Sequence, residues 1–542
     1  MKKTQWSFRQ MVLSVLCISC LTAPLSAAIP DENTLANTLI NQQELVVAFD
    51  MNDEPISYDP HCSTNINSAQ LFTAITEGIV TYNPVTLTPT LGTATSITTS
   101  KDALTWTIRI RENARFSNGD KITAKTYRDS WLRMLDPKDP GELANLLDMI
   151  KGVKEYRTGT DLNQDHVGIH IDGLYTLILE LNAPSPYLLN ILCHHAFTPI
   201  HPANLNNPEI LNADTFVSSG AFRITKATKD VIYLEKNPYY WDYDAVKLNH
   251  IRIKLRSSSM KLLSEFSQGL VHWSETYLDI SMLPNNDDIA AFPEYSTSFF
   301  YFSATDGPYA DPEIRKALAL MIPWNKVRDV SASIYKTNSL VPQDSSYHGN
   351  TGITKQNKNE ALKLLKHAGY PNGKDLPVMQ IAIYPNAKLE QMTDIITDVW
   401  SEELGMTIII DVVPFSLYIG NPEASPYSMA YITWIGDFYD PYSFLSLWTS
   451  NSGFNPSRYH NKTYDDLIEE ALLKKTKSER YQLFKKAEQL LLDTAVVIPI
   501  SHGVSINFVD NDVLKGWFPN LLNIHPFKYM SLEHTISKQS SL

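Results

Sequence analysis

The residue patterns that most often carry catalysis in exported proteins are each incomplete in this 542-residue chain. Ser219 lacks the glycine two positions earlier that a nucleophile elbow requires. The run from Gly369 to Lys374 resembles a phosphate loop, but Asp375 stands where Ser or Thr would bind magnesium. No His-Glu-x-x-His sequence is present, which removes the main support for zinc-dependent proteolysis. The sequence therefore predicts a protein that is not an enzyme, although paired carboxylates on distant strands stay open as a glycosidase arrangement.

Metal ligation is not favoured by any local pattern. His194 and His195 are adjacent, so their side chains diverge on a strand or on a helix. The segment from Asp161 to Asp165 begins like a calcium loop, but His166 occupies the position where the sharp turn needs glycine. We expect no metal site and no cofactor.

Alternating apolar and polar residues predict half-buried strands that would position any site. Such runs lie at Leu104 to Ile110, Tyr175 to Leu181 and Ile251 to Leu255. The run from Met406 to Val413 is nearly continuous in apolar residues, which predicts a fully buried strand.

Helices are predicted between these strands in the second half of the chain. Glu360 to His367 has helical spacing and stops at Gly369. Tyr464 to Lys474 and Ser478 to Leu492 are amphipathic, with Thr463 and Ser478 as expected N-caps, and the strand Val496 to Ile500 follows. This interleaving indicates a mixed α/β fold, and the length requires at least two domains, because single cores stop growing at roughly 250–300 residues.

The first residues have the pattern of a secretory signal. Basic residues precede an apolar run from Met11 to Leu25 that is too short to span a bilayer comfortably. Cleavage after Ala28 fits a signal peptidase and predicts a soluble mature protein, whereas Cys20 offers the alternative of a lipid anchor. We expect the soluble form.

Charge and cysteine usage exclude some classes of partner and bear on disulfide formation. The formal net charge of −13 disfavours nucleic acid and anionic membranes, which need clustered Lys and Arg. Only Cys62 and Cys193 follow the signal, and the sequence favours two separate thiols over one bridge.

A series of short motifs runs in one order through almost the whole mature chain, and together they resemble the peptide- and oligopeptide-binding proteins of ABC importers, extracellular solute-binding protein family 5. The motifs are Asp59-Pro60-His61, Glu77 to Tyr82, Leu87-Thr88-Pro89, Asn113 to Asp120, Thr123-Ala124-Lys125, Trp131 to Pro137, Gly220-Ala221-Phe222 and Asn237 to Trp241. In physical terms these residues are turns and core positions, so they indicate the fold and not the ligand site.

The resemblance implies a two-lobed periplasmic-binding-protein fold with a hinge and an additional domain inserted early in the chain. The expected parts are the signal (1–28), lobe I (29–72, 204–298 and 503–542), the inserted domain (73–203) and lobe II (299–502). It also implies a monomeric periplasmic protein that captures short peptides between its lobes. The expected partner is a membrane-embedded ABC permease with cytoplasmic ATPase subunits.

In the family the peptide is held as an added strand, so backbone groups supply most hydrogen bonds. The resemblance places ligand contacts at two segments, which comprise Thr64, Asn65 and Ile66, and Tyr431, Thr433, Trp434, Ile435 and Asp437. Asp437 matches the aspartate that pairs with the peptide ammonium. For Trp434 we expect a pocket wall in preference to a core position.

The chain departs from the family pattern at several of these positions. Tyr431 stands where several oligopeptide binders carry arginine, so the group that binds the peptide carboxylate is not assigned. Tyr431 is either a packing residue or a hydrogen-bonding one. Cys62 replaces a Lys-like residue, and Leu143 and Leu146 replace expected aromatic residues.

Other functions stay open from the sequence. The same fold could bind a murein peptide, a nickel chelate or haem. An exported chaperone and a hydrolase with scattered carboxylates are the alternatives from other classes.

Overall fold

The computed structural model describes residues 32–49, 56–62, 66–205, 212–255, 258–275, 286–305, 307–331, 335–344, 346–414, 416–419 and 426–534. The predicted signal, including Cys20, and the predicted contacts Thr64 and Asn65 lie outside these ranges. The side chains of Cys62 and Ile66 also lie outside the description. None of the described helices combines the length and hydrophobicity that crossing a bilayer requires.

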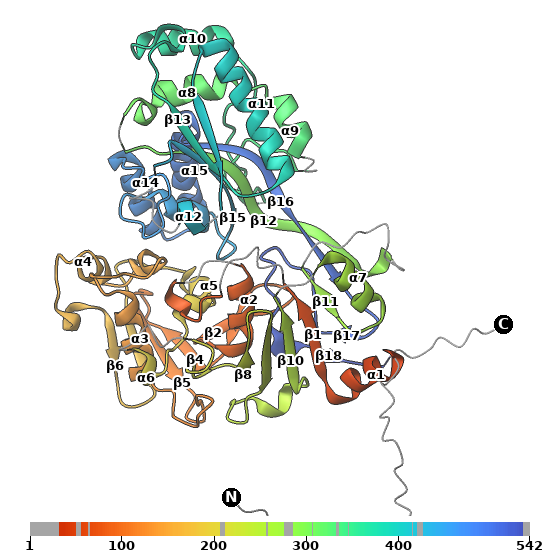
Figure 1. Ribbon diagram of the computed structural model, residues 1–542. Helices are drawn as coiled ribbons and strands as arrows, with labels where there is room; N and C mark the ends of the chain where they lie inside the picture. The colour runs from red at the N-terminus through yellow and green to blue at the C-terminus, as the bar shows by residue number, and fades with distance from the viewer. Residues whose placement is uncertain are drawn as a thin grey trace, which may run out of the picture.

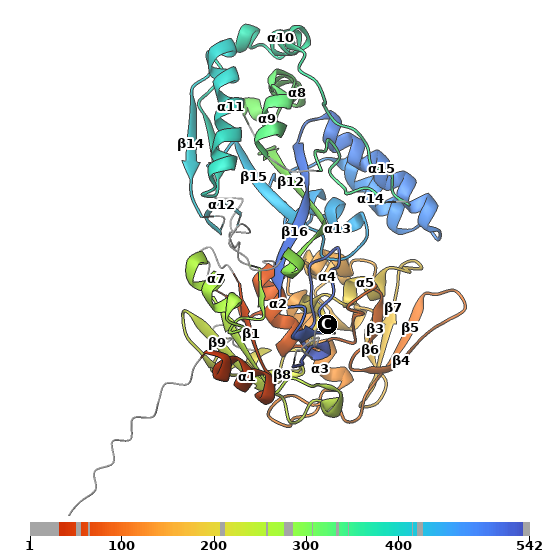
Figure 2. The ribbon, with the colours of Figure 1, turned by 90° about the vertical axis from the view of Figure 1, so that its right-hand side faces the viewer.

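A mixed sheet joins the two lobes. Among the described residues it has ten strands in the order β14-β13-β15-β12-β16-β11-β1-β10-β9-β8. Its two longest strands, β12 (Ile289–Phe302) and β16 (Val497–Val509), pair antiparallel and run from one lobe into the other (Figures 1 and 2). Their pairing shifts register between Pro293 and Thr297 and again between Ser298 and Phe299.

These irregularities fall close to the sequence boundary that we expected between lobe I and lobe II at residue 298. The predicted domain boundaries themselves stay a prediction. The mixed α/β architecture is confirmed.

Lobe II packs helices on both faces of its part of the sheet. One face buries Ile314, Ile396 and Trp400 beneath helices α8 to α11, and the other buries Phe484 and Leu491 beneath α14 and α15. Its elements are α8 (Pro312–Met321), α9 (Trp324–Ser331), α10 (Lys358–His367), β13 (Met379–Ile383), α11 (Ala387–Leu404), β14 (Ile408–Val412), α12 (Ser416–Ile419), β15 (Met429–Ile435), α13 (Tyr442–Leu445), α14 (Lys462–Leu472) and α15 (Lys477–Asp493).

Lobe I covers the other end of the sheet. Phe72 of α2 packs on one face with the C-terminal segment, and Leu262 and Phe266 of α7 pack on the other. Its elements are α1 (Glu32–Gln42), β1 (Glu44–Ala48), α2 (Ile66–Ile75), β8 (Phe222–Ala227), β9 (Val231–Lys236), β10 (His250–Lys254), α7 (Ser259–Ser267), β11 (Trp273–Ser274), β17 (Leu514–Lys515) and β18 (Ser531–Leu532).

A separate four-stranded sheet, in the order β4-β5-β7-β6, lies beside lobe I (Figure 1). It belongs to the inserted domain, whose hydrophobic residues include the fully buried Trp131 and Phe116. The elements of this region are β2 (Val80–Tyr82), β3 (Pro89–Leu91), β4 (Ala94–Thr99), β5 (Thr105–Ile110), α3 (Ala124–Met134), α4 (Val153–Arg157), β6 (Ile169–Ile171), β7 (Thr176–Glu180), α5 (Leu188–Leu192) and α6 (Pro202–Leu205).

The sequence motifs meet one another inside the fold. Arg133 donates to Asp59 at 3.0 Å and contacts the His61 ring nitrogen at 2.8 Å, which joins the inserted domain to the segment before α2. Glu77 accepts a hydrogen bond from the Trp241 indole at 2.5 Å and pairs with Lys528 at 2.7 Å. The motifs therefore build the framework, as the physical interpretation of them predicted.

Gly220, in another of these motifs, shows why a motif residue is fixed. A Cβ atom at this position would lie 2.6 Å from the Ala74 carbonyl oxygen and 2.6 Å from the Thr76 nitrogen. Backbone at the end of α2 cannot move aside cheaply, so overpacking here costs typically 1–3 kcal/mol. We expect Gly220→Ala to lower the free energy of unfolding by about that amount in urea denaturation. Gly173 and Gly159 have φ angles of +69° and +74°, where alanine would be strained, so neither position gives a matched control. Ala203→Gly, at an exposed position of the short helix α6, is the surface comparison.

Most predicted elements are present with ends shifted by one or two residues. Two N-caps were predicted wrongly: Asn461 caps α14 and Thr476 caps α15. The interpretation of Met406 to Val413 as a fully buried strand was also wrong. Because β14 is the edge strand of the sheet, Ile409 and Val412 are each 44% exposed.

Candidate ligand-binding site between the lobes

Asp437 lies two residues after the end of β15, where lobe II faces the inserted domain. The preceding Gly436 donates its backbone N–H to the Tyr295 carbonyl at 2.8 Å, which anchors the turn to β12. A Cβ at position 436 would lie 2.7 Å from Tyr295 Cδ1 and 2.7 Å from Ser443 Oγ. The turn is further held from the inserted domain, because the Tyr82 hydroxyl donates to the Asp437 carbonyl oxygen at 2.9 Å.

The Asp437 carboxyl group is buried without a strong cationic partner. Its side chain is 9% exposed, and burial raises its pKa to about 8, with a smaller contribution from the charge of Glu142. Desolvation penalises a carboxylate that no cation neutralises. The group is therefore neutral at pH 7 in this state and would be ionised by a cation that enters beside it.

His194 of the inserted domain is the protein side chain that faces this carboxyl group across the lobe boundary. Its Nε2 lies 3.7 Å from Asp437 Oδ1, which is longer than a hydrogen bond. The Ala196 N–H donates to His194 Nδ1 at 3.2 Å, so the neutral ring carries its proton on Nε2. Burial and the adjacent His195 hold the pKa of His194 well below its ordinary value, so this ring does not supply the missing positive charge.

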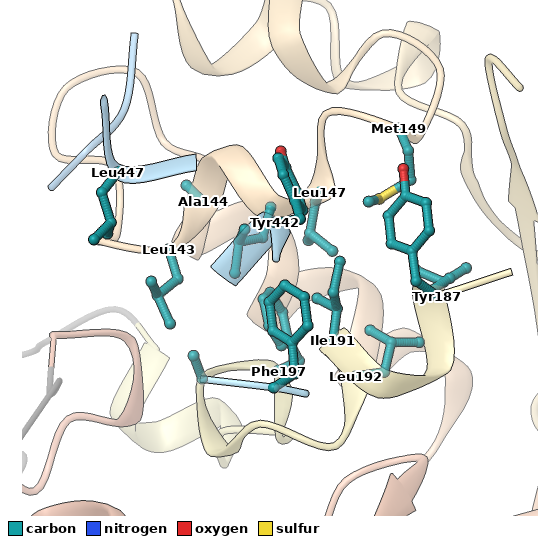
Figure 3. Packing of buried hydrophobic residues seen from close by; sticks show 14 of the residues in the cluster. Leu143, Ala144, Leu147, Met149, Tyr187, Ile191, Leu192, Phe197, Tyr442 and Leu447 are labelled. Carbon is teal, nitrogen blue, oxygen red and sulfur yellow. The ribbon is translucent and has the colours of Figure 1, made fainter. Parts of the chain in front are cut away.

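Apolar side chains close the boundary around this pair. Figure 3 shows Tyr442 and Leu447 of lobe II packed among residues of the inserted domain. The rings of Tyr187 and Tyr442 lie 6.1 Å apart with their planes tilted by 63°. Tyr187, Tyr442 and Leu447 are buried, and a buried apolar setting strengthens electrostatic interactions nearby.

Polar contacts also cross from the inserted domain to lobe II. Arg157 donates to the Asn451 carbonyl at 2.9 Å, and Lys154 forms an ion pair with Glu469. The Arg480 guanidinium lies 4.2 Å from the centre of the Tyr187 ring. The structure therefore has its lobes in contact, with Asp437 enclosed at the boundary.

The other predicted contacts on β15 divide between the faces of the strand. Thr433 and Ile435 are partly exposed, and the Thr433 hydroxyl shares a 2.7 Å hydrogen bond with Ser298. Trp434 is 5% exposed, donates its indole N–H to the Ser443 carbonyl at 3.0 Å and packs against Phe454. This placement favours a core position for Trp434 over the pocket wall that we expected, and its contact with ligand stays a prediction.

The Tyr431 side chain is buried in this structure, and its contact with ligand stays a prediction. Its ring lies 4.9 Å from Phe300 and 5.9 Å from Tyr384, within the core of lobe II. The position therefore offers no cation for a ligand carboxylate. Whether Thr64, Asn65 and the Ile66 side chain contact ligand stays a prediction, because they lie outside the described residues.

Metal and thiol chemistry find no support at this site. Within the described ranges, no three His, Cys, Asp or Glu side chains are grouped so that they could hold a metal ion. Cys193 is a free thiol, and burial raises its pKa, which keeps it protonated and unreactive.

The family model for bacterial extracellular solute-binding proteins, family 5 Middle, matches residues 88–456. The chain belongs to solute-binding protein family 5. Its family relatives include the dipeptide-binding protein DppE of Bacillus subtilis (strain 168), which is 27% identical over 504 residues that cover 90% of this chain and 91% of DppE. The family 5 relatives compared are named as binding proteins and not as enzymes.

Solved structures of two binding proteins share the fold of this chain. The periplasmic oligopeptide-binding protein OppAIV from Borrelia burgdorferi superposes with a TM-score of 0.81 at 25% identity, covering 90% of this chain and all of that one. The Escherichia coli murein tripeptide binding protein MppA gives 0.80 at 23% identity, covering 91% of this chain and 99% of MppA. The expected fold class is thereby confirmed.

Two structures of MppA match this chain to different extents, which indicates how its lobes are arranged. A structure described as the unliganded open form of MppA matches with a TM-score of only 0.62, at the same coverage of this chain. The lobes of the present structure are therefore arranged differently from that open form, in agreement with the interlobe contacts described above.

Sequence reasoning identified Asp437 but missed the residues that surround it in this family 5 site. Tyr82 was within a quoted motif, so its position was available as a candidate. His194 was considered only as a metal ligand, because no local pattern shows that it faces a residue 243 positions later.

Proposed function

We propose that this protein is the ligand-capturing component of an ABC importer, which binds short peptides between its lobes with the peptide ammonium at Asp437. Peptide binding is supported by family membership and by relatives that are named as dipeptide- and oligopeptide-binding proteins. The proposal rests on one observation above others, which is the Asp437 carboxyl enclosed at the lobe boundary at 9% exposure.

Energetics favour an ammonium at this position. A buried carboxylate is stabilised by a cation that hydrogen-bonds it, and such charge-assisted bonds are roughly twice as strong as neutral ones. Beyond Ala430, β15 pairs with β12 alone among the described strands, so its other edge is where an extended peptide would align as an added strand. Contacts made only when the lobes meet would select the closed state on binding.

The proposal extends to the compartment in which the protein works and to its membrane partner. We propose a monomeric periplasmic protein, released from its signal after Ala28, that delivers cargo to a membrane permease driven by cytoplasmic ATPase subunits. Anchoring through Cys20 is the alternative processing. Catalysis has no role in this function.

Identification of the bound cargo tests this proposal. We expect native mass spectrometry of protein purified without denaturation to show adducts with the masses of short peptides, which disappear in Asp437→Asn. A haem or nickel-chelate adduct would contradict the proposal. Fragmentation of the released cargo distinguishes an ordinary peptide from a murein peptide, which is the second candidate because MppA, named for murein tripeptide, shares the fold.

A further inference from the structure

Two carboxyl groups other than Asp437 lie where the lobe I sheet meets the strands that cross between the lobes. Glu275 directly follows β11, and its N–H donates to the Ala48 carbonyl at 3.0 Å, at the carboxyl end of β1. Strands β1 and β11 are parallel. The carboxyl ends of parallel strands are where open α/β sheets bind their ligands.

Glu294 lies on β12 within the irregular stretch where pairing with β16 shifts register. Its carboxylate lies over Gly503, because a Cβ built at that glycine would be 2.9 Å from Glu294 Oε2. The next residue, Tyr295, accepts the Gly436 N–H at 2.8 Å. Glu294 is therefore one strand across from the turn that carries Asp437, a separation of about 5 Å between adjacent strands.

Among the residues that the structure describes, no basic side chain neutralises either group. Burial raises the pKa of Glu275 to about 8, with a further contribution from the charge of Glu294, and burial also raises the pKa of Glu294. Within the part of the chain that the structure describes, no Lys, Arg or His pairs with either carboxyl. Glu275 Oε1 is buried and has no hydrogen-bond donor.

Glu488 is a buried glutamate with a structural role, and its hydrogen bonding differs from that of Glu275. Glu488 accepts hydrogen bonds from the backbone N–H groups of Leu340 and Val341 at 2.9 and 3.0 Å, and from the Tyr347 hydroxyl at 2.8 Å. Leaving a buried acceptor without a donor costs about 1–3 kcal/mol. The unpartnered Glu275 Oε1 carries this unfavourable free energy in the present state, so a structural role does not explain why a glutamate is placed here.

We propose that Glu275 and Glu294 form a second cation subsite, which takes an amine or guanidinium of the ligand while its α-ammonium lies at Asp437. This inference rests on the proposed function and names its substrate class: short peptides that carry a basic side chain. Position 431 holds a packed tyrosine and supplies no positive charge, which is consistent with a site for positively charged groups of the ligand.

Paired tripeptides test the subsite by calorimetry. Each pair has lysine or norleucine at the second or the third position, so the two members differ by one amine on a similar carbon chain. We expect wild-type protein to bind the lysine member at least tenfold more tightly at one of the two positions. The isosteric double variant Glu275→Gln/Glu294→Gln should reduce that preference below about twofold and leave the affinity for trialanine unchanged.

The matched control is Glu112→Gln/Glu155→Gln, which removes two charges from exposed positions of the inserted domain and should keep the preference. No lysine preference in wild-type protein, or one that survives in the Glu275/Glu294 variant, overturns the subsite. Melting curves of each variant show that it is folded.

Failure of the proposed function gives a different result. If no tripeptide binds wild-type protein, peptide capture is contradicted, and the subsite is then judged with 1,5-diaminopentane. A rise in melting temperature in wild-type protein that is absent in Glu275→Gln/Glu294→Gln supports a cation site. Equal melting shifts, or none, overturn it.

Discussion

Replacing Asp437 with asparagine is expected to weaken the binding of trialanine by about 30- to 4,000-fold, because the variant keeps the shape of the side chain and loses its charge. Truncating one partner of a buried charge pair costs about 2–5 kcal/mol, and each 1.4 kcal/mol is a factor of ten in affinity. Isothermal titration calorimetry at pH 7 measures the change.

The ligand-free variant should be as stable as wild-type protein or more stable. Burial raises the pKa of Asp437 from 3.8 to about 8. For a carboxyl whose folded-state pKa is raised, the contribution to stability is complete below the unfolded-state value and is lost as the pH rises through about 8. Asparagine cannot ionise, so the penalty near pH 7 and 8 is absent. A lower melting temperature would indicate damage to the fold and not to the ammonium contact.

Asp466→Asn is the matched control for this substitution. Asp466 is exposed on α14, and within the described part of the chain it forms an ion pair with the exposed Lys462. Surface ion pairs contribute about 0–1 kcal/mol, so trialanine should bind this variant as it binds wild-type protein. A loss of affinity that is equal in both variants would contradict a specific role for Asp437.

Peptide affinity is expected to rise with pH and to reach its maximum near pH 8. With the lobes in contact and no cation beside it, Asp437 is protonated below about pH 8, whereas an ammonium partner requires the carboxylate. Binding therefore releases up to one proton, and affinity should increase by up to about tenfold per pH unit from pH 6 toward pH 8. Above that range the peptide α-amino group, with a pKa of about 7.7–8.0, loses its charge and affinity falls.

Calorimetry in buffers of different ionisation enthalpy counts the released protons directly. We expect about one proton per trialanine bound at pH 6.5 in wild-type protein and none in Asp437→Asn. Trialanine carries no second cation, so Glu275 and Glu294 do not add to the count. The lowered pKa of His194 keeps that ring neutral across the range. Binding that releases no proton in wild-type protein would contradict the ion pair.

Much of the fold followed from local pattern, since alternation and capping residues act over a few positions. The strands at β5, β7 and β10 and the helices α10, α14 and α15 were predicted on this basis. The burial of β14 was not, because a continuous apolar run is the same whether a strand lies inside a sheet or at its edge. Only the order of strands in the assembled sheet makes β14 an edge.

The candidate site was accessible to the sequence only through resemblance. Asp437 came from a motif, but its burial depends on His194 and on Tyr82, which lie in another domain. Trp434 was expected at a pocket wall, and the Ser443 carbonyl that its indole reaches could not be anticipated from spacing. Glu275 and Glu294 lie in no motif, since their proximity results from β11 and β12 flanking β16.

Comparison of one short peptide with its N-acetylated form tests the central claim most directly. Acetylation removes the positive charge of the α-amino group and leaves every side chain and the carboxylate in place. We predict that wild-type protein binds trialanine in a saturable titration and binds N-acetyl-trialanine at least about 30-fold more weakly, as expected for the loss of a buried charge pair. Equal affinities for the two peptides would contradict capture of a peptide through its ammonium at Asp437.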